Sequence, residues 1–339
     1  MSERNFLIRP YREGEEIAEW FDNTRLSGLH GCAHWGMVRY ILNKSMHEPS
    51  RSLPLECGSA MHEALAIAMC TRIIDTHGGI AYHRAEAIIN NKDRWNATGD
   101  YAVGDRAIKE FVDVGNVEGA ALATLYSSTY YDDPSDTKRT IANMETSLIY
   151  ALSAVDHVPA VINGKVCVEL PIKFVIEYRD KAYVYNGRGD AIVATPNGYG
   201  PLDWKTSSQL STGWENQWHL AHQMTGYCAG TAMDMGQPVN DGYVVGIQIP
   251  LARDTYKSVR DVHFVRQEHQ FESWINYVLD GIDIYERFKD RPFEATKRSD
   301  YCYRFFRMCQ FADLCTAEPD LIEQFREELV TVEWHPEDE

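Results

Sequence analysis

The chain has 339 residues and a formal net charge of −17, from 33 Lys and Arg against 50 Asp and Glu. Its length allows one large core or two smaller ones, and the acidic balance argues against a protein that coats nucleic acid through bulk electrostatics. There is no apolar run of the ~18 residues that a membrane span needs, and the charged N-terminus lacks the apolar core of a secretion signal. We therefore expect a soluble, cytoplasmic protein whose eight cysteines are thiols or metal ligands.

Hydrophobic spacing predicts mainly helices before residue 166. Residues 1–57 mix turn signals with one helical stretch around His34 to Leu42, and the run GSAMHEALAIAMCTRII predicts a helix that starts at Gly58. Residues 105–128 and 138–157 have the same helical period.

The period changes to two at residue 166, which is the signature of strands. Strands are predicted over 166–176, 182–194 and 199–206, and the last two are joined by the turn-rich segment TPNGYG. Residues 214–235 return to helical spacing and precede a short buried strand at 243–249. Because a helical crossover joins parallel strands, the strand at 243–249 should run parallel to the strand at 199–206.

We expect one domain over residues 1–339, because no linker or repeat divides the sequence, and another long helix at 264–288. The parts of this domain in chain order are an N-terminal region (1–57), a helical part (58–165), a catalytic sheet core (166–250), a helix and Cys-rich segment (251–320) and an acidic tail (321–339).

Two carboxylates and a lysine share one face of the predicted hairpin. Asp203 and Lys205 are two residues apart on a strand, so their side chains project together. If the hairpin turns about Pro196–Asn197, Asp190 lies opposite Asp203 with Cβ atoms ~5 Å apart. Like charges this close need a cation between them, and hard oxygen ligands suit Mg²⁺ or Mn²⁺, which can activate water for phosphodiester hydrolysis. A cross-strand salt bridge at a surface hairpin is the alternative interpretation.

The segments GRGD and LDWKTSS, separated by a turn, resemble the D…(D/E)XK core of the PD-(D/E)XK nucleases. The resemblance is to the RecB-like and CRISPR-adaptation branch with its phage-type exonucleases. Two more segments resemble motifs of that branch in the same order: GSAMHEAL, its helix with a metal-ligand histidine, and HQMTGYCAG, its Q-x-x-x-Y motif. The resemblance implies an α/β, restriction-endonuclease-like core with a mixed sheet flanked by helices, a helical N-terminal region and a Cys-rich C-terminal segment.

The resemblance also implies a metal site. Asp190 and Asp203 would bind Mg²⁺ or Mn²⁺, joined by the Trp204 carbonyl and by His62, whose nitrogen donor would favour Mn²⁺. Taken alone, a histidine on a helix is more often a packed or solvated residue.

Three further residues receive catalytic roles from the resemblance. Lys205 would serve the attacking water, and Gln223 and Tyr227, four apart on one helical face, would position Lys205, DNA phosphate or both. Without the resemblance, Gln223 and Tyr227 would be interpreted as polar residues at the edge of a helix.

Three cysteines near the C-terminus have C-x6-C-x5-C spacing and a fourth lies far upstream: Cys302, Cys309, Cys315 and Cys32. This pattern resembles the 4Fe–4S staple of the same nucleases, although the first interval departs from their usual C-x2-C. Thiolates suit either an Fe–S cluster or tetrahedral Zn²⁺, and because His30 and His34 flank Cys32, a Cys/His zinc site is the competing interpretation. Unligated loop cysteines are a third.

The favoured function is therefore a metal-dependent DNA nuclease, an exonuclease that works from DNA ends with single strands favoured, in the host-cell cytoplasm if phage-encoded. The alternative is a DNA-binding or scaffold subunit of a helicase, recombinase or integration complex with the same fold. A pure binding module has no need of Asp190, Asp203 and Lys205 together. A sequence-specific endonuclease is less favoured, because no recognition domain is evident.

Overall fold

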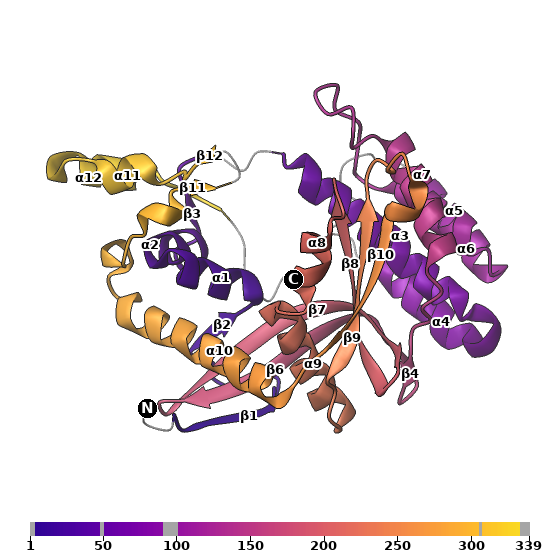
Figure 1. The fold of residues 1–339 in the computed structure, drawn as a ribbon, viewed down its shortest axis with the longest axis horizontal. Helices are drawn as coiled ribbons and strands as arrows, with labels where there is room; N and C mark the ends of the chain where they lie inside the picture. Colours follow the sequence, from indigo (N-terminus) through magenta and orange to yellow (C-terminus); the bar gives the residue numbers. More distant parts are fainter. Residues whose placement is uncertain (1–3, 48–50, 91–100, 305–306, 333–339) are drawn as a thin grey trace. The chain divides into compact units, whose positions relative to one another are not determined.

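The computed structural model describes residues 4–47, 51–90, 101–304 and 307–332 (Figure 1). The chain divides into two compact units. Unit 1 contains residues 1–51, 172–187 and 268–339, and unit 2 contains residues 52–171 and 188–267. Strands β6 (Val168–Tyr178) and β7 (Lys181–Thr195) each contribute residues to both units. The single domain expected over residues 1–339 stays a prediction.

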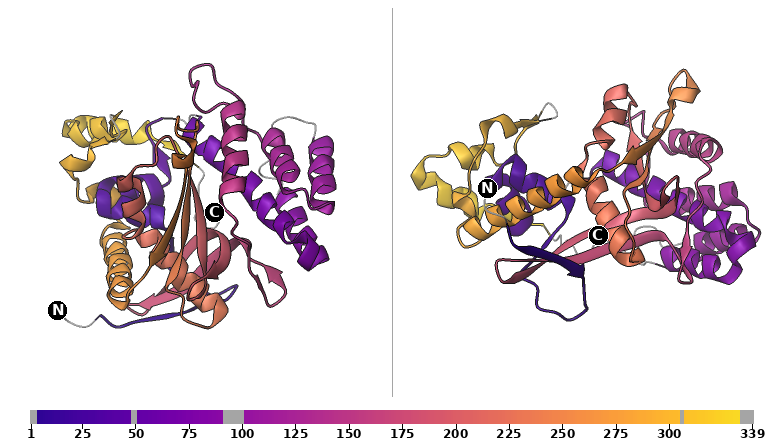
Figure 2. Two further views of the ribbon diagram at one scale, coloured as in Figure 1. Left: turned by 45° about the vertical axis from the view of Figure 1, so that its right-hand side comes forward. Right: turned by 60° about the horizontal axis from the view of Figure 1, so that its bottom comes forward.

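The helical part of unit 2 is a group of helices that lie together in both views of Figure 2: α3 (Leu53–Arg72), α4 (Ile74–Ile89), α5 (Tyr101–Asp113), α6 (Val117–Ser127) and α7 (Ile141–Ala154). The helix predicted from Gly58 begins five residues earlier, because Pro54 is compatible with the first helical turn. The helix predicted over 105–128 is two helices. Gly115 separates them with φ +66°, a conformation that glycine adopts at no steric cost.

The sheet of unit 2 has the order β7–β8–β9–β10, with β8 at Gly198–Ser207, β9 at Asp241–Gln248 and β10 at Val259–Val265. β8 and β9 are parallel, as predicted, and the other two pairs are antiparallel. The smaller elements are β4 (Val161–Ile162), β5 (Lys165–Val166) and the 3₁₀ turn Thr255–Lys257.

Two predictions in this region were wrong. The helix predicted over 214–235 is interrupted at residues 219–221, which leaves α8 (Thr212–Trp218) and α9 (His222–Met235). The helix predicted over 264–288 began too early. Its first residues belong to β10, in which Val262 and Phe264 are buried at strand spacing, and the helix α10 starts only at Glu268.

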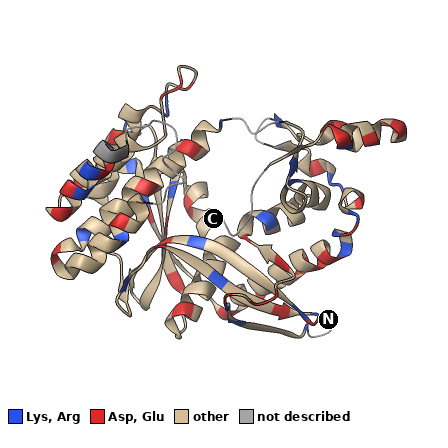
Figure 3. Ribbon diagram, turned by 180° about the vertical axis from the view of Figure 1, so that it is seen from behind, with Lys and Arg blue, Asp and Glu red and all other residues tan. Residues whose placement is uncertain are grey.

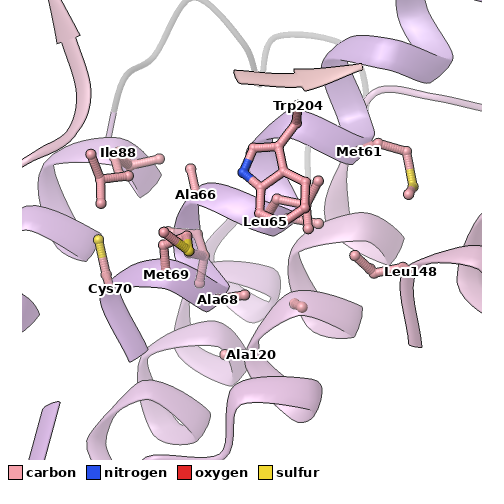
Figure 4. Close-up of a cluster of buried hydrophobic side chains, with 14 of the residues drawn as sticks. Met61, Leu65, Ala66, Ala68, Met69, Cys70, Ile88, Ala120, Leu148 and Trp204 are labelled. Atoms are coloured by element: carbon pink, nitrogen blue, oxygen red, sulfur yellow. The ribbon is translucent and has the colours of Figure 1, made fainter. Parts of the chain in front are cut away.

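The core of unit 2 lies between the sheet and the helical part. β8 buries Leu202 and Trp204, which pack against Met61 and Leu65 of α3 (Figure 4). Because side chains alternate along a strand, this burial directs residues 203 and 205 to the opposite face of the sheet. The hydrophobic contact with α3 therefore fixes the face on which the predicted catalytic residues lie.

Unit 1 combines the two ends of the chain with residues 172–187. Its N-terminal elements are β1 (Phe6–Pro10), β2 (Glu19–Phe21), α1 (Asn23–Gly31), α2 (Ala33–Gly36), a π-helical turn (Met37–Ile41) and β3 (Lys44–Ser45). β1 pairs antiparallel with β6, and β2 pairs parallel with β7. Helix α10 (Glu268–Phe288) is anchored to these strands by Trp274, which packs against Phe174 and Tyr185.

The remaining elements of unit 1 follow α10: short 3₁₀ turns (Pro292–Glu294 and Ser299–Tyr301), β11 (Tyr303–Arg304), β12 (Arg307–Met308), α11 (Ala312–Thr316), α12 (Pro319–Glu327) and β13 (Val330–Thr331). β13 pairs with β3, and Phe311, Leu314 and Leu329 pack against Val38. The C-terminal segment is thus held against residues 38–45 by a small core of its own.

Acidic side chains are distributed over both units (Figure 3). Part of the predicted acidic tail is ordered structure, because residues 321–327 complete α12, and residues 333–339 lie outside the described residues. Among the helices of the described ranges, none combines the length and apolar character that crossing a membrane requires.

The close approach of β8 and β9 yields a prediction about stability. A Cβ at Gly200 would lie 1.9 Å from the Asp241 carbonyl oxygen, a backbone atom that cannot move aside cheaply. We expect Gly200→Ala to lower the free energy of unfolding by at least about 2 kcal/mol, measured by urea denaturation. Gly213→Ala is the control. This change adds a methyl group to α8, 3.6 Å from Ser211 Oγ. The free energy of unfolding should stay equal or rise by up to about 1 kcal/mol. Equal stability of both variants would contradict this account of the strand contact.

Candidate active site

The β7–β8 hairpin brings the two predicted carboxylates together. Its turn lies at Pro196–Asn197, with Thr195 paired to Gly198 and Ala191 paired to Leu202. This register has the predicted midpoint, and Asp190 and Asp203 are the next residues beyond its last pair. The turn expected at Pro196–Asn197 is confirmed.

Asp203 and Lys205 form an ion pair on the face of β8 that points away from the α3 contact. Lys205 Nζ lies 2.7 Å from Asp203 Oδ2. Asp203 is only 2% exposed, and its Oδ2 lacks a hydrogen bond of good geometry despite the nearby ammonium. The carboxylate therefore retains capacity for another ligand.

His62 completes the group from helix α3. Its Nδ1 lies 3.1 Å from Asp190 Oδ1, and Asp190 Oδ2 accepts a hydrogen bond of 2.5 Å from the backbone N–H of Trp204. Met61 and Leu65 of the same helix are buried in the core. Because hydrophobic packing fixes Met61 and Leu65, the intervening residue His62 is held in contact with Asp190.

The charges of these side chains shift one another's pKa values. Burial favours the neutral imidazole, but the Asp190 carboxylate outweighs it and raises the pKa of His62. Burial also opposes ionisation of Asp190, but the positive charges of His62 and Lys205 lower its pKa. At Asp203 the balance is reversed, because burial and repulsion from Asp190 raise its pKa although Lys205 opposes the shift. The two carboxylates raise the pKa of Lys205 against the effect of burial, so Lys205 is an ammonium here.

This donor set suits a hard divalent cation. Mg²⁺ or Mn²⁺ would bind the two carboxylates and the imidazole, and Asp203 Oδ2 is a buried oxygen that has no hydrogen bond of good geometry. In the described part of the chain no three His, Cys, Asp or Glu side chains already form a metal-holding group. Here His62 pairs with Asp190 and Lys205 with Asp203, so a bound ion would compete with these two contacts.

Gln223 and Tyr227 lie on α9, which packs against β8 and β9. Gln223 Nε2 donates a 2.9 Å hydrogen bond to the Tyr227 hydroxyl. The predicted spacing on one helical face is therefore confirmed, while the roles toward Lys205 or phosphate stay predictions.

The predicted cluster cysteines lie in unit 1, where all four line one cavity of about 310 Å³: Cys32, Cys302, Cys309 and Cys315. None of the eight cysteines of the chain forms a disulfide. Burial raises the pKa of Cys315 to about 11, and the neighbouring cysteines contribute to the shift.

Of the two candidate histidines, His34 lines this cavity and His30 does not. His34 Nδ1 lies 3.6 Å from Cys315 Sγ, and burial lowers the pKa of His34 to about 4, so its imidazole is neutral. His30 instead stacks on Tyr277, with its Nε2 2.8 Å from the Tyr277 carbonyl oxygen. A mixed Cys/His zinc site would therefore use His34.

The sequence did not indicate one neighbour of the candidate centre. The ring of Trp218, at the end of α8, lies 5.9 Å from Lys205 Nζ. A single tryptophan within a helical pattern carries no signal for this contact, because the break between α8 and α9 sets its position.

Comparison with known protein families gives one match. The sequence model of the PD-(D/E)XK nuclease superfamily matches residues 23–316, a span that includes the hairpin, His62, the Gln223–Tyr227 pair and the four cavity cysteines. No curated protein matches the chain. The mixed α/β architecture, with a sheet flanked by helices, is consistent with the fold of that family. Nucleases of this family typically use divalent metals such as Mg²⁺ and act on DNA. The chain belongs to the PD-(D/E)XK nuclease superfamily.

Proposed function

We propose that this protein is a Mg²⁺- or Mn²⁺-dependent deoxyribonuclease that hydrolyses phosphodiester bonds from DNA ends, with single strands favoured. The observation that carries the proposal is the convergence of Asp190, Asp203, Lys205 and His62 in one group. Repulsion between two buried carboxylates costs free energy, and a divalent cation would turn it into a binding contribution.

In this proposal each side chain has a distinct task. Asp190, Asp203, His62 and the Trp204 carbonyl would hold the ion, which would supply Lewis-acid stabilisation of the charge that develops on phosphate oxygens. Lys205, which holds its proton on Nζ, orients the attacking water through N–H donors.

Gln223 and Tyr227 have a supporting role. Their mutual hydrogen bond limits the rotamers of both side chains on α9, which packs against β8. Polar groups restricted in this way can position a phosphate or Lys205 at a smaller entropic cost.

The acidic surface is compatible with DNA as substrate. A net charge of −17 disfavours sequence-independent binding over a wide surface, so the grip on DNA has to be local and assisted by cations. The alternative is a DNA-binding subunit without cleavage. Such a subunit has no need of the buried Asp190–Asp203 pair, whose mutual repulsion destabilises the fold.

The first test is cleavage of end-labelled single- and double-stranded DNA. Asp203→Ala and Lys205→Ala should lower the rate at least about a thousandfold, equivalent to about 4 kcal/mol of transition-state stabilisation. Lys257→Ala, which removes an exposed lysine paired with Asp254, should cleave like the wild type. Wild-type rates in either active-site variant would remove the assignment, and DNA binding without cleavage by the wild type would favour the subunit alternative.

The second prediction concerns the choice of metal. Because imidazole is a softer donor than carboxylate, His62 should make Mn²⁺ a better activator than Mg²⁺. His62→Ala should lose most of the Mn²⁺-supported rate and less of the Mg²⁺-supported rate. The control is His83→Ala, which alters an exposed helix residue. If His62→Ala keeps full activity with both metals, His62 serves only to pair Asp190.

We also propose that the cavity of unit 1 holds a structural 4Fe–4S cluster bound by Cys32, Cys302, Cys309 and Cys315. Four thiols around a cavity of about 310 Å³ suit a cluster that fills the space between them. A single Zn²⁺ instead requires all donors to converge at ~2.3 Å on one point. The four thiols come from residues 32 and 302–315, so the cluster would bind both ends of the chain within unit 1.

The third prediction is the metal content. Protein purified without oxygen should be brown and contain about four irons per chain. Cys309→Ser and Cys315→Ser should bleach this colour and lower the melting temperature, because metal binding contributes to folding free energy. Cys167→Ala, which alters a buried cysteine of unit 2, should retain the iron. One colourless zinc ion per chain would instead support the site with His34.

A further inference from the structure

Lys205 has a second neighbour besides Asp203. Its ammonium nitrogen lies 2.7 Å from Asp203 Oδ2 and 5.9 Å from the centre of the Trp218 ring. The second distance is within the range in which a cation is attracted to an aromatic face, and tryptophan is the best such partner. The lysine side chain is therefore restrained by a carboxylate and by an indole.

The position of Trp218 is held by a buried arginine. Arg266, only 2% exposed, donates to the carbonyl oxygens of Trp218 (2.7 Å), His219 (3.1 Å) and Ala221 (3.2 Å), and its Nε donates to Thr225 Oγ1 (2.8 Å). These carbonyls lie at the end of α8 and in the break before α9. One guanidinium thus fixes the backbone that carries the indole.

A second indole supports the first from the sheet side. Trp214 contacts Trp218 edge-on with ring centres 5.5 Å apart. Trp214 also lies directly over Gly246, where a Cβ would be 2.3 Å from the indole ring. Gly246 is the β9 partner of Lys205 in the strand ladder. The space left by this glycine admits Trp214 beside Lys205, and Trp214 packs against Trp218.

The indole N–H of Trp218 bears on why a tryptophan, and not another aromatic residue, lies beside Lys205. Among the described atoms this N–H is buried and has no hydrogen-bond partner, which is unfavourable. A phenylalanine would avoid that cost but would attract an ammonium less strongly. The tryptophan therefore offers Lys205 a stronger contact at some expense in stability.

We propose that Trp218 is a positioning residue that keeps Lys205 in place when a divalent ion takes over Asp203. The inference rests on the proposed nuclease function. An ion on the Asp203 carboxylate competes with the Lys205 ammonium for the same oxygen and repels it. The indole is uncharged and is held by Arg266 and Trp214, so its attraction for Lys205 persists and the ammonium stays at the active site.

The geometric part of the proposal is tested by NMR on full-length protein labelled with [ε-¹³C]lysine. The Lys205 signal is the one lost in Lys205→Arg. In the wild type its ε-methylene protons should be shifted upfield by the indole ring, without metal and after addition of Mg²⁺. In Trp218→Leu, which lacks the ring, the shift should be absent with and without Mg²⁺, and Trp218→Phe should give an intermediate shift.

The kinetic part uses the same variants. We expect kcat to fall about tenfold in Trp218→Leu, equivalent to about 1.4 kcal/mol, and less in Trp218→Phe, with KM within about twofold of the wild type. Tyr256→Leu is the matched control, because it removes an aromatic ring 5.2 Å from an exposed lysine, Lys257. Its kcat should be unchanged.

The outcomes separate the inference from the proposed function. A wild-type Lys205 signal that loses its upfield shift once Mg²⁺ is added, or a kcat of Trp218→Leu within twofold of the wild type, overturns the positioning role. If the Leu variant does not fold, Trp218→Phe decides: a smaller shift and a lower kcat support the role, and wild-type values overturn it. If the wild-type protein cleaves no DNA, the proposed function fails, while the NMR result still decides whether Trp218 orients Lys205.

Discussion

The structure around the candidate centre depends on the proximity of two negative charges. Asp190 and Asp203 face one another across a hairpin whose register is set by the turn at Pro196–Asn197. Buried like charges destabilise a fold unless cations compensate them. In this chain the compensation comes from His62 on helix α3 and from Lys205 on the same strand as Asp203. The four side chains therefore form one electrostatic unit, and the pKa value of each follows from the positions of the others.

The hydrophobic face of the same hairpin fixes the strand register that brings these side chains together. A slip of one residue in β8 would move Asp203 and Lys205 into the apolar core and Trp204 to the face where the carboxylates now lie. Packing of Trp204 and Leu202 against α3 excludes that slip, and α3 also carries His62. Apolar burial on one face of β8 thus offsets the unfavourable free energy of holding like charges close together on its other face. The geometry of the candidate centre therefore rests on this contact between strand β8 and helix α3.

Contacts between chain segments far apart in sequence form the cysteine cavity of unit 1. β13 pairs with β3, Ser45 Oγ donates a 2.7 Å hydrogen bond to the Gln310 side chain, and a small apolar group surrounds Phe311. These contacts bring the segment after residue 300 to the region around Cys32. A cluster there would link residue 32 to residues 302–315 within unit 1, whereas the carboxylates of the candidate centre belong to unit 2.

The sequence by itself determined the strand hairpin and the faces of Asp203, Lys205 and Trp204, because these follow from a period of two and a short turn. It also determined the parallel β8–β9 pair, because a helical crossover joins these two strands. It also indicated His62 and the grouped cysteines through motifs. It did not determine where helices stop: the break between α8 and α9 depends on carbonyls bound by Arg266, 41 residues beyond Thr225 in the chain. For the same reason, only the tertiary structure placed Trp218 beside Lys205 and chose His34 over His30 at the cysteines. Such contacts join residues far apart in sequence, and no local pattern records them.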